Sequence, residues 1–207
     1  MKKNYILAAF QETLTQRFPA QAERLQAQTE RRMQELWAAY AGASPELHRH
    51  LESQIIPGIA VYETLQTMMP RKEAYQTVHG YVEQQAWKIR RAILKLMHVP
   101  GLWRRVPGIA TKGTRKMFGT AAGFQAVEKE TDSNVWRIDM VKCPYHDACV
   151  TQGCPELCPC FCDSDDITYD GIHPRLVWHR TKTLGRGDDC CDFCLRAEKG
   201  PERKTVQ

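Results

Sequence analysis

The chain has 207 residues, of which 43% are hydrophobic, so it can bury a core without disulfide staples. No uninterrupted apolar stretch reaches the roughly 18 residues of a membrane span, and the apolar run near the basic N-terminus is too short for a signal peptide. The net charge of +5 is modest, and the cations between Arg71 and Lys116 are not part of a known nucleic-acid-binding motif. We therefore expect a cytoplasmic protein that binds neither a membrane nor nucleic acid.

The first hundred residues have the pattern of helices. The four-residue spacing of Ile6, Phe10 and Leu14 predicts a first helix, and the strong helix formers of residues 20–40 predict a second. Ser44, followed by Pro45, has the pattern of an N-cap. The helix that it starts is expected to run to residue 69 with a kink at Pro57, which lacks a backbone N–H. A further helix is predicted from residue 71 to about residue 100.

The second half changes period. Residues 101–123 hold five glycines and are expected to form a connecting loop with one short helix. Strands are then predicted at residues 124–128, 135–141, 175–184 and 191–195, with antiparallel pairing. Between the second and third strands, Cys154, Cys158 and Cys162 stand four residues apart and would share one helix face. Pro159 leaves two alternatives: the helix starts near it, or the cysteine stripe is bent.

These elements predict an α+β fold in which N-terminal helices pack against a C-terminal antiparallel sheet with a cysteine-rich helical insertion. We assign residues 1–45 to an N-terminal helical extension, residues 46–196 to the main α+β domain, and residues 197–207 to a polar tail. The oligomeric state leaves no signature in the sequence.

All nine cysteines lie between Cys143 and Cys194. In a reducing cytoplasm such a cluster indicates metal ligation or thiol chemistry rather than a disulfide framework. The spacing does not match paired zinc knuckles or the usual cluster motifs, and it leaves both zinc and an iron–sulfur cluster open as cofactors. The candidate metal ligands are Cys143, Cys158, Cys162 and Cys191.

Two of these cysteines have acidic neighbours that suit catalysis. Cys162 precedes Asp165 and Asp166 at helical spacing, and Cys191 is followed directly by Asp192. A catalytic thiol needs a lowered pKa, which a helix N-terminus, a cation or an imidazole can supply. The alternative is that the cysteines are small buried apolar side chains, which is common for free cysteine.

The segments KCPYH, GCPELCPCFCDSD, RTKTL and GDDCCDF occur in this order, after IIPGIAVYETL. Together they resemble the L-2-amino-thiazoline-4-carboxylic acid hydrolase family of bacterial proteins, over residues 51–195. The resemblance implies hydrolytic opening of a cyclic isothiourea, by cleavage of a carbon–sulfur or carbon–nitrogen bond. The chain departs from the family pattern in its additional cysteines, which are Cys149, Cys160, Cys190 and Cys194.

The implied reaction requires a general base and acid, a small anionic substrate and a group that binds its carboxylate. For catalysis we predict Asp165 and Asp192, with Cys162 or Cys191 as nucleophile in a covalent route. The predicted substrate-binding residues are His173, Arg180, Lys182 and Arg186. The alternative function is a cysteine-rich sensor or redox module that holds a metal or small ligand without turnover.

Overall fold

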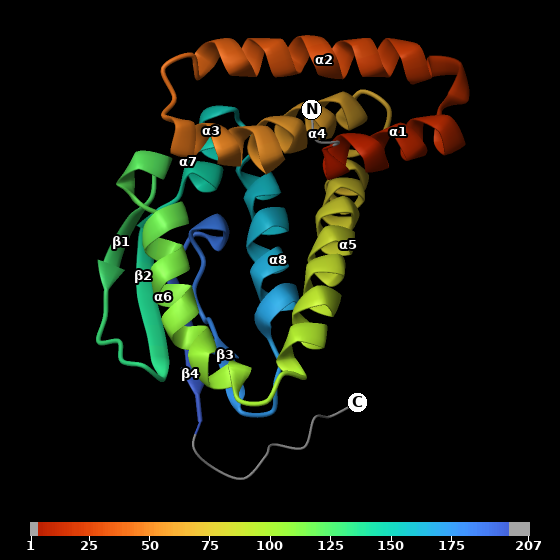
Figure 1. Ribbon diagram of the computed structural model, residues 1–207. Helices are drawn as coiled ribbons and strands as arrows, with labels where there is room; N and C mark the ends of the chain where they lie inside the picture. The colour runs from red at the N-terminus through yellow and green to blue at the C-terminus, as the bar shows by residue number, and fades with distance from the viewer. Residues whose placement is uncertain (1–3, 199–207) are drawn as a thin grey trace.

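The computed structural model describes residues 4–198, and it confirms the α+β fold (Figure 1). Eight α-helices are described: α1 (Tyr5–Arg17), α2 (Ala22–Ala39), α3 (Pro45–His50), α4 (Ile56–Gln66), α5 (Arg71–Met97), α6 (Val106–Met117), α7 (Pro144–Thr151) and α8 (Cys158–Tyr169). Four strands are described: β1 (Gln125–Glu128), β2 (Val135–Lys142), β3 (Leu176–His179) and β4 (Cys191–Ala197). Short 3-10 turns join several of them, including η6 (Leu184–Arg186).

Helices α1 to α4 form one layer, from which α5, α6 and α8 descend (Figure 1). The predicted stripe of Ile6, Phe10 and Leu14 is buried on α1, because these residues share one helix face. They pack in a core with α2, α4, α5 and the start of α8, and Cys158 and Cys160 are buried in that core. This helical core buries one end of the cysteine-rich segment.

A π-helical turn, Leu51–Ile55, separates α3 from α4 just before Pro57, where the sequence predicted a kink. Pro57 has no N–H to donate to the carbonyl of Ser53, four residues earlier. The side-chain amide of Asn4 donates to that carbonyl and to the carbonyl of Glu52, both at 3.0 Å. Asn4, the N-cap of α1, thus supplies donors to the backbone of the π-helical turn.

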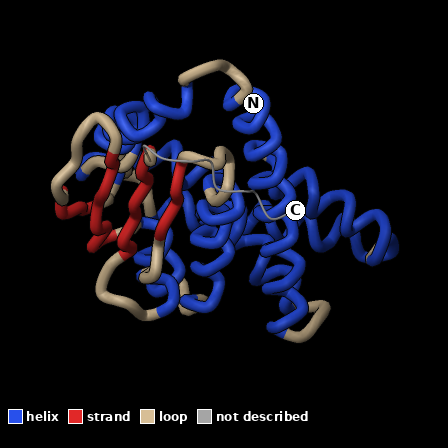
Figure 2. The backbone as a smooth tube through the Cα atoms, turned by 90° about the horizontal axis from the view of Figure 1, so that it is seen from below, coloured by secondary structure: helices blue, strands red, loops and turns tan. Residues whose placement is uncertain are grey.

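The sheet is antiparallel with strand order β1-β2-β4-β3. Figure 2 shows the strands together at one end of the molecule, with most of the helices beyond them. Alternation along the strands sends one set of side chains toward the helices. On β4 this set includes Cys191, Phe193 and Leu195, whereas Asp192 and Cys194 lie on the other face.

Two parts of the chain differ from the sequence-based expectation. The segment expected to be mostly loop contains the 12-residue helix α6, in which only Pro107 is buried. The glycines and cations of this segment favoured a loop in the sequence-based prediction. A helix that is mostly exposed to solvent can accommodate both kinds of residue. The third strand ends at His179 rather than at residue 184, because the carboxylate of Asp192 accepts the backbone N–H groups of Thr181 and Lys182 at 2.8 and 2.6 Å. These donors are therefore not available to a sheet ladder.

Pro159 stands in the first turn of α8, which begins at Cys158, so the first of the two alternatives for this helix is correct. Within residues 4–198, no helix is long and apolar enough to span a bilayer.

Candidate active site

Four cysteines meet where the helical core adjoins the core on the sheet. Cys143 follows β2, Cys158 and Cys162 lie on α8, and Cys191 begins β4. The sulfur atoms of Cys158 and Cys162 are 4.0 Å apart, as expected for residues one helical turn apart. The Cys191 sulfur accepts the backbone N–H of Leu184 at 3.3 Å. The sequence-predicted cysteines therefore gather in one region of the fold.

Their environment favours neutral thiols. Burial raises the pKa of Cys143 to about 12 and that of Cys191 to about 11. The hydrogen bond with Cys158, followed by burial, raises the pKa of Cys162 far above its ordinary value, although Arg180 opposes this effect. A thiolate is the nucleophilic form of cysteine, so this environment does not activate Cys162 or Cys191.

The arrangement does not fit a metal site. Within the part of the chain that the structure describes, no group of three or more His, Cys, Asp or Glu side chains is placed to share one ion. The backbone of Gly185 also lies against the sulfur pair: a Cβ there would stand 2.9 Å from the sulfur of Cys158 and 3.0 Å from that of Cys162. Neither zinc nor an iron–sulfur cluster is needed to explain how these residues pack.

This close approach leads to a prediction for Gly185→Ala. The added methyl group would push the η6 turn away from two sulfurs that α8 holds in place, so we expect a loss of about 1–3 kcal/mol in the free energy of unfolding. Gly80→Ala in α5 is the matched control, because a Cβ at that position would meet nothing within 4 Å and alanine is the better helix former. Thermal melts of both variants test this; equal melting temperatures would contradict the close contact.

Asp165 and Arg180 form the charged part of the site. The guanidinium nitrogen Nη1 of Arg180 lies 3.7 Å from Oδ2 of Asp165. The side chain of Arg180 is only 2% exposed, while that of Asp165 is 41% exposed. Burial nevertheless raises the pKa of Asp165 to about 7, an effect that Arg180 opposes. Asp165 thus combines a carboxyl group that water reaches with a pKa near neutrality.

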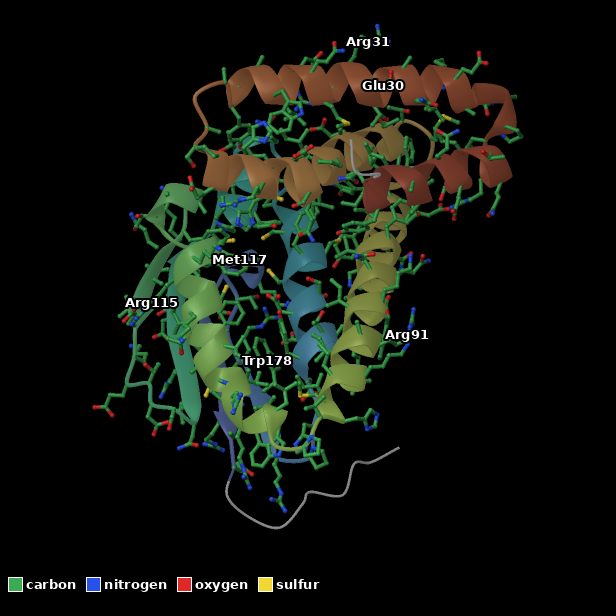
Figure 3. The ribbon with its side chains drawn as sticks, viewed as in Figure 1. Glu30, Arg31, Arg91, Arg115, Met117 and Trp178 are labelled. Carbon is green, nitrogen blue, oxygen red and sulfur yellow. The ribbon has the colours of Figure 1, made fainter. Side chains whose placement is uncertain are left out.

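The other nitrogen of Arg180, Nη2, is fully engaged. It donates to the backbone carbonyl of Cys162 at 3.0 Å and to the carboxylate of Asp166. Asp166 also accepts the indole N–H of Trp178 at 2.8 Å. The guanidinium carbon lies 5.4 Å from the centre of the Phe193 ring. Figure 3 shows Trp178 in the space between α6 and α8, on the helix-facing side of the sheet.

A cluster of aromatic rings packs next to Arg180. Trp136, Trp178 and Phe193 lie on adjacent strands with ring centres 5.8 to 6.4 Å apart. Tyr169 of α8 adds a ring 5.2 Å from Trp178. The buried cation thus lies beside a cluster of packed aromatic rings and contacts one of them, Phe193.

His50 and Tyr145 form a hydrogen-bonded pair near Cys143. Nε2 of His50 lies 2.9 Å from the carbonyl of Met117, which can only accept, so this nitrogen carries the proton. In the neutral ring Nδ1 then accepts from the hydroxyl of Tyr145 at 3.1 Å, and burial lowers the pKa of His50 toward this neutral form. Burial, with Cys143 nearby, raises the pKa of Tyr145. This neutral pair fastens α7 to α3 and to the end of α6.

The remaining sequence-predicted residues lie elsewhere. Asp192 is on the other face of the sheet from Cys191; partial burial would raise its pKa, but hydrogen bonds from Thr181 and Lys182 lower it. The Lys182 ammonium is 2.9 Å from Asp189 on the surface. Arg186 is half exposed and pairs with Asp163 at 2.6 Å. His173 stacks on Trp103, 5.1 Å between ring centres, in a separate groove of about 410 Å³.

Of the predicted site residues, the structure therefore brings together Cys143, Cys158, Cys162, Asp165, Arg180 and Cys191. Sequence reasoning did not assign roles to Asp166, Trp178, His50 or Tyr145. A signal for Trp178 was available, because it stands two residues before Arg180 in the predicted strand 175–184, where residues two apart share a face. No signal linked His50 to Tyr145, which is 95 residues away.

The model of the L-2-amino-thiazoline-4-carboxylic acid hydrolase family matches residues 48–195, more than half of the chain. The chain belongs to this family. Searches of curated proteins and of solved structures gave no match. The matched residues include α4 to α8 and all of the sheet except the end of β4, and thus every residue of the site just described. The family identifies the protein as a hydrolase.

Proposed function

We propose that this hydrolase opens a small cyclic isothiourea that carries a carboxylate, similar to 2-amino-thiazoline-4-carboxylate. The observation that carries the proposal is the pairing of Asp165 with Arg180. One side chain can exchange a proton near neutral pH, and the other presents a buried cation, 3.7 Å away. A carboxylate substrate needs such a cation, and hydrolysis of the ring needs such a proton carrier.

The chemistry can run with water as the nucleophile. Asp165 in its ionised form takes a proton from water as the oxygen adds to the ring carbon between nitrogen and sulfur, and passes that proton to the ring nitrogen. The carbon–sulfur bond then breaks as the new hydroxyl group becomes a carbonyl. Asp165 carries the hydroxyl proton to the departing sulfur. One water is consumed, and the product bears a urea group and a free thiol, with no change in oxidation state.

A covalent route through Cys162 is the alternative within the same function. It would require a thiolate, whereas burial and the hydrogen bond with Cys158 favour the neutral thiol. We therefore assign no catalytic role to Cys162 and place it beside the charged pair. Nine unpaired cysteines also suit a reducing cytoplasm, which we propose as the location of the protein.

The test is turnover of 2-amino-thiazoline-4-carboxylate, followed by mass spectrometry as the gain of one water. We expect Cys162→Ser to keep activity within about tenfold of the wild type, since general acid–base catalysis by Asp165 would remain. Asp163→Asn is the matched control, because Asp163 lies on the same helix but pairs with Arg186 and His79. Absence of turnover by the wild type would refute the proposed substrate class. Loss of all activity in Cys162→Ser, with a covalent adduct on the wild-type enzyme, would refute the water route.

A further inference from the structure

We propose that Asp166 and Trp178 are positioning residues that aim Nη1 of Arg180 at the carboxylate of the ligand and thereby set the specificity of the site for anions. This inference deepens the proposed function and rests on it for the identity of the ligand. Neither residue touches the reacting atoms in the scheme above. Both act through Arg180.

The first observation is the unequal use of the two Arg180 nitrogens. Nη2 has two acceptors, the Asp166 carboxylate and the Cys162 carbonyl. Nη1 is buried and has no hydrogen-bond acceptor among the described residues. Leaving a buried N–H group of a charged side chain unsatisfied costs free energy unless another group accepts from it. The nearest carboxylate, Asp165, is 3.7 Å away, which is longer than a hydrogen bond.

The second observation is that Asp166 is itself fixed. Its Oδ1 accepts from the Trp178 indole and its Oδ2 from Arg180, so both oxygens are held by donors from the sheet side. Trp178 in turn is packed among Trp136, Tyr169 and Phe193. The guanidinium is planar, so fixing Nη2 and the ring contact with Phe193 also fixes the direction of Nη1.

These contacts predict the chemistry of the ligand. Asp166 already offsets part of the charge of Arg180 through Nη2. Nη1 lacks a hydrogen-bond acceptor among the described residues, so an anion would be recognised by the direction of the N–H groups of Nη1 as well as by the remaining charge. A carboxylate that accepts from Nη1 would lie close to Asp165, whose Oδ2 is 3.7 Å from the same nitrogen. A carboxamide in the place of the carboxylate could face Nη1 with its NH₂ group, which would put two donors together, or with its oxygen. In either orientation it would lack the negative charge of the carboxylate.

The experiment uses L-thiazolidine-4-carboxylate, a probe that lacks the isothiourea group, and its carboxamide, with binding to the full-length protein measured by calorimetry. The wild type is expected to bind the carboxylate about tenfold or more tightly than the carboxamide. Trp178→Phe removes one donor and leaves every charge in place. A reduction of the carboxylate preference by about fivefold to tenfold in this variant therefore reports direction alone.

Asp166→Asn gives a result whose sign separates positioning from simple attraction. Both oxygens of Asp166 face donors, so asparagine must turn its NH₂ group toward either Trp178 or Arg180. Positioning predicts weaker carboxylate binding in this variant. Removal of a competing negative charge alone predicts tighter binding. In an Arg180→Gln background, Asp166→Asn should have no further effect on the preference. Asp163→Asn, which alters a carboxylate on the same helix, should match the wild type.

Several outcomes would overturn the inference. One is a wild type that does not prefer the carboxylate. Another is an unchanged preference in Trp178→Phe, or tighter carboxylate binding in Asp166→Asn. Equal losses for both probes, together with a lowered melting temperature, would show a merely structural role. These measurements do not need turnover, so a protein that binds the carboxylate as described but does not open the isothiourea ring would contradict the proposed function and leave this inference intact.

Discussion

Asp165→Asn is expected to lower kcat by about 10²–10⁴-fold, the usual contribution of a general acid–base residue. The variant keeps the size of the side chain and removes its capacity to exchange a proton. In the wild type, kcat/KM should fall as the pH drops below about 7, because burial raises the pKa of Asp165 to about 7 and protonated Asp165 cannot take a proton from water. The pH dependence of kcat/KM measures this directly.

The melting temperature of Asp165→Asn shows whether a loss of activity comes from misfolding. A carboxyl group whose pKa is raised on folding stabilises the native state fully below its unfolded pKa of 3.8, and this contribution is lost as the pH rises through about 7. Because the side chain is 41% exposed, solvent screening reduces the effect, and we expect about 1 kcal/mol. Asp165→Asn should thus melt about 2–4 °C above the wild type near pH 8, with a smaller gain near pH 5. An inactive variant that melts below the wild type at both values would indicate misfolding instead.

Arg180→Lys is expected to lower kcat/KM for the carboxylate substrate by about 10–100-fold, mostly through KM. Lysine retains a positive charge but lacks the planar pair of nitrogens that serves Asp166 on one side and the ligand on the other. Steady-state kinetics with 2-amino-thiazoline-4-carboxylate checks the size of the effect and its division between kcat and KM.

Lys182→Gln is the matched control for this substitution. Lys182 was also predicted to bind the substrate, yet its ammonium pairs with Asp189 on the surface, so we expect kcat/KM within about twofold of the wild type. A larger loss for Lys182→Gln than for Arg180→Lys would assign the carboxylate to Lys182 and contradict the site described above.

The helices and strands followed from local patterns where those patterns were strong. The stripe on α1 followed from spacing alone, and the irregular turn just before Pro57 from the missing N–H of proline. Helix α6 was underestimated because its glycines and cations lie on a helix with little buried surface. The length of β3 depended on Asp192, which lies eleven residues beyond Thr181. The Asp192 carboxylate accepts backbone N–H groups that a longer strand would have used in the sheet. Such competition is invisible to a periodicity argument.

The candidate site was only partly predictable for a similar reason. Cys162 and Asp165 share a helix, so their spacing was informative. The meeting of Asp165 with Arg180 depends on how α8 packs against β3, and the bond between Asp166 and Trp178 depends on the same packing. Sequence order also placed Asp192 beside Cys191, although alternation along a strand sends neighbours to opposite faces.

The location of the site at the boundary between two cores has a consequence for the ligand. Asp165 projects from a helix that starts in the helical core, whereas Arg180 follows a strand that belongs to the sheet core. A molecule that contacts both residues would join the two halves of the protein and would bind only when they are docked together. By mass action, substrate would then hold the halves together. Ligand binding would therefore also stabilise the packing of the two cores against each other.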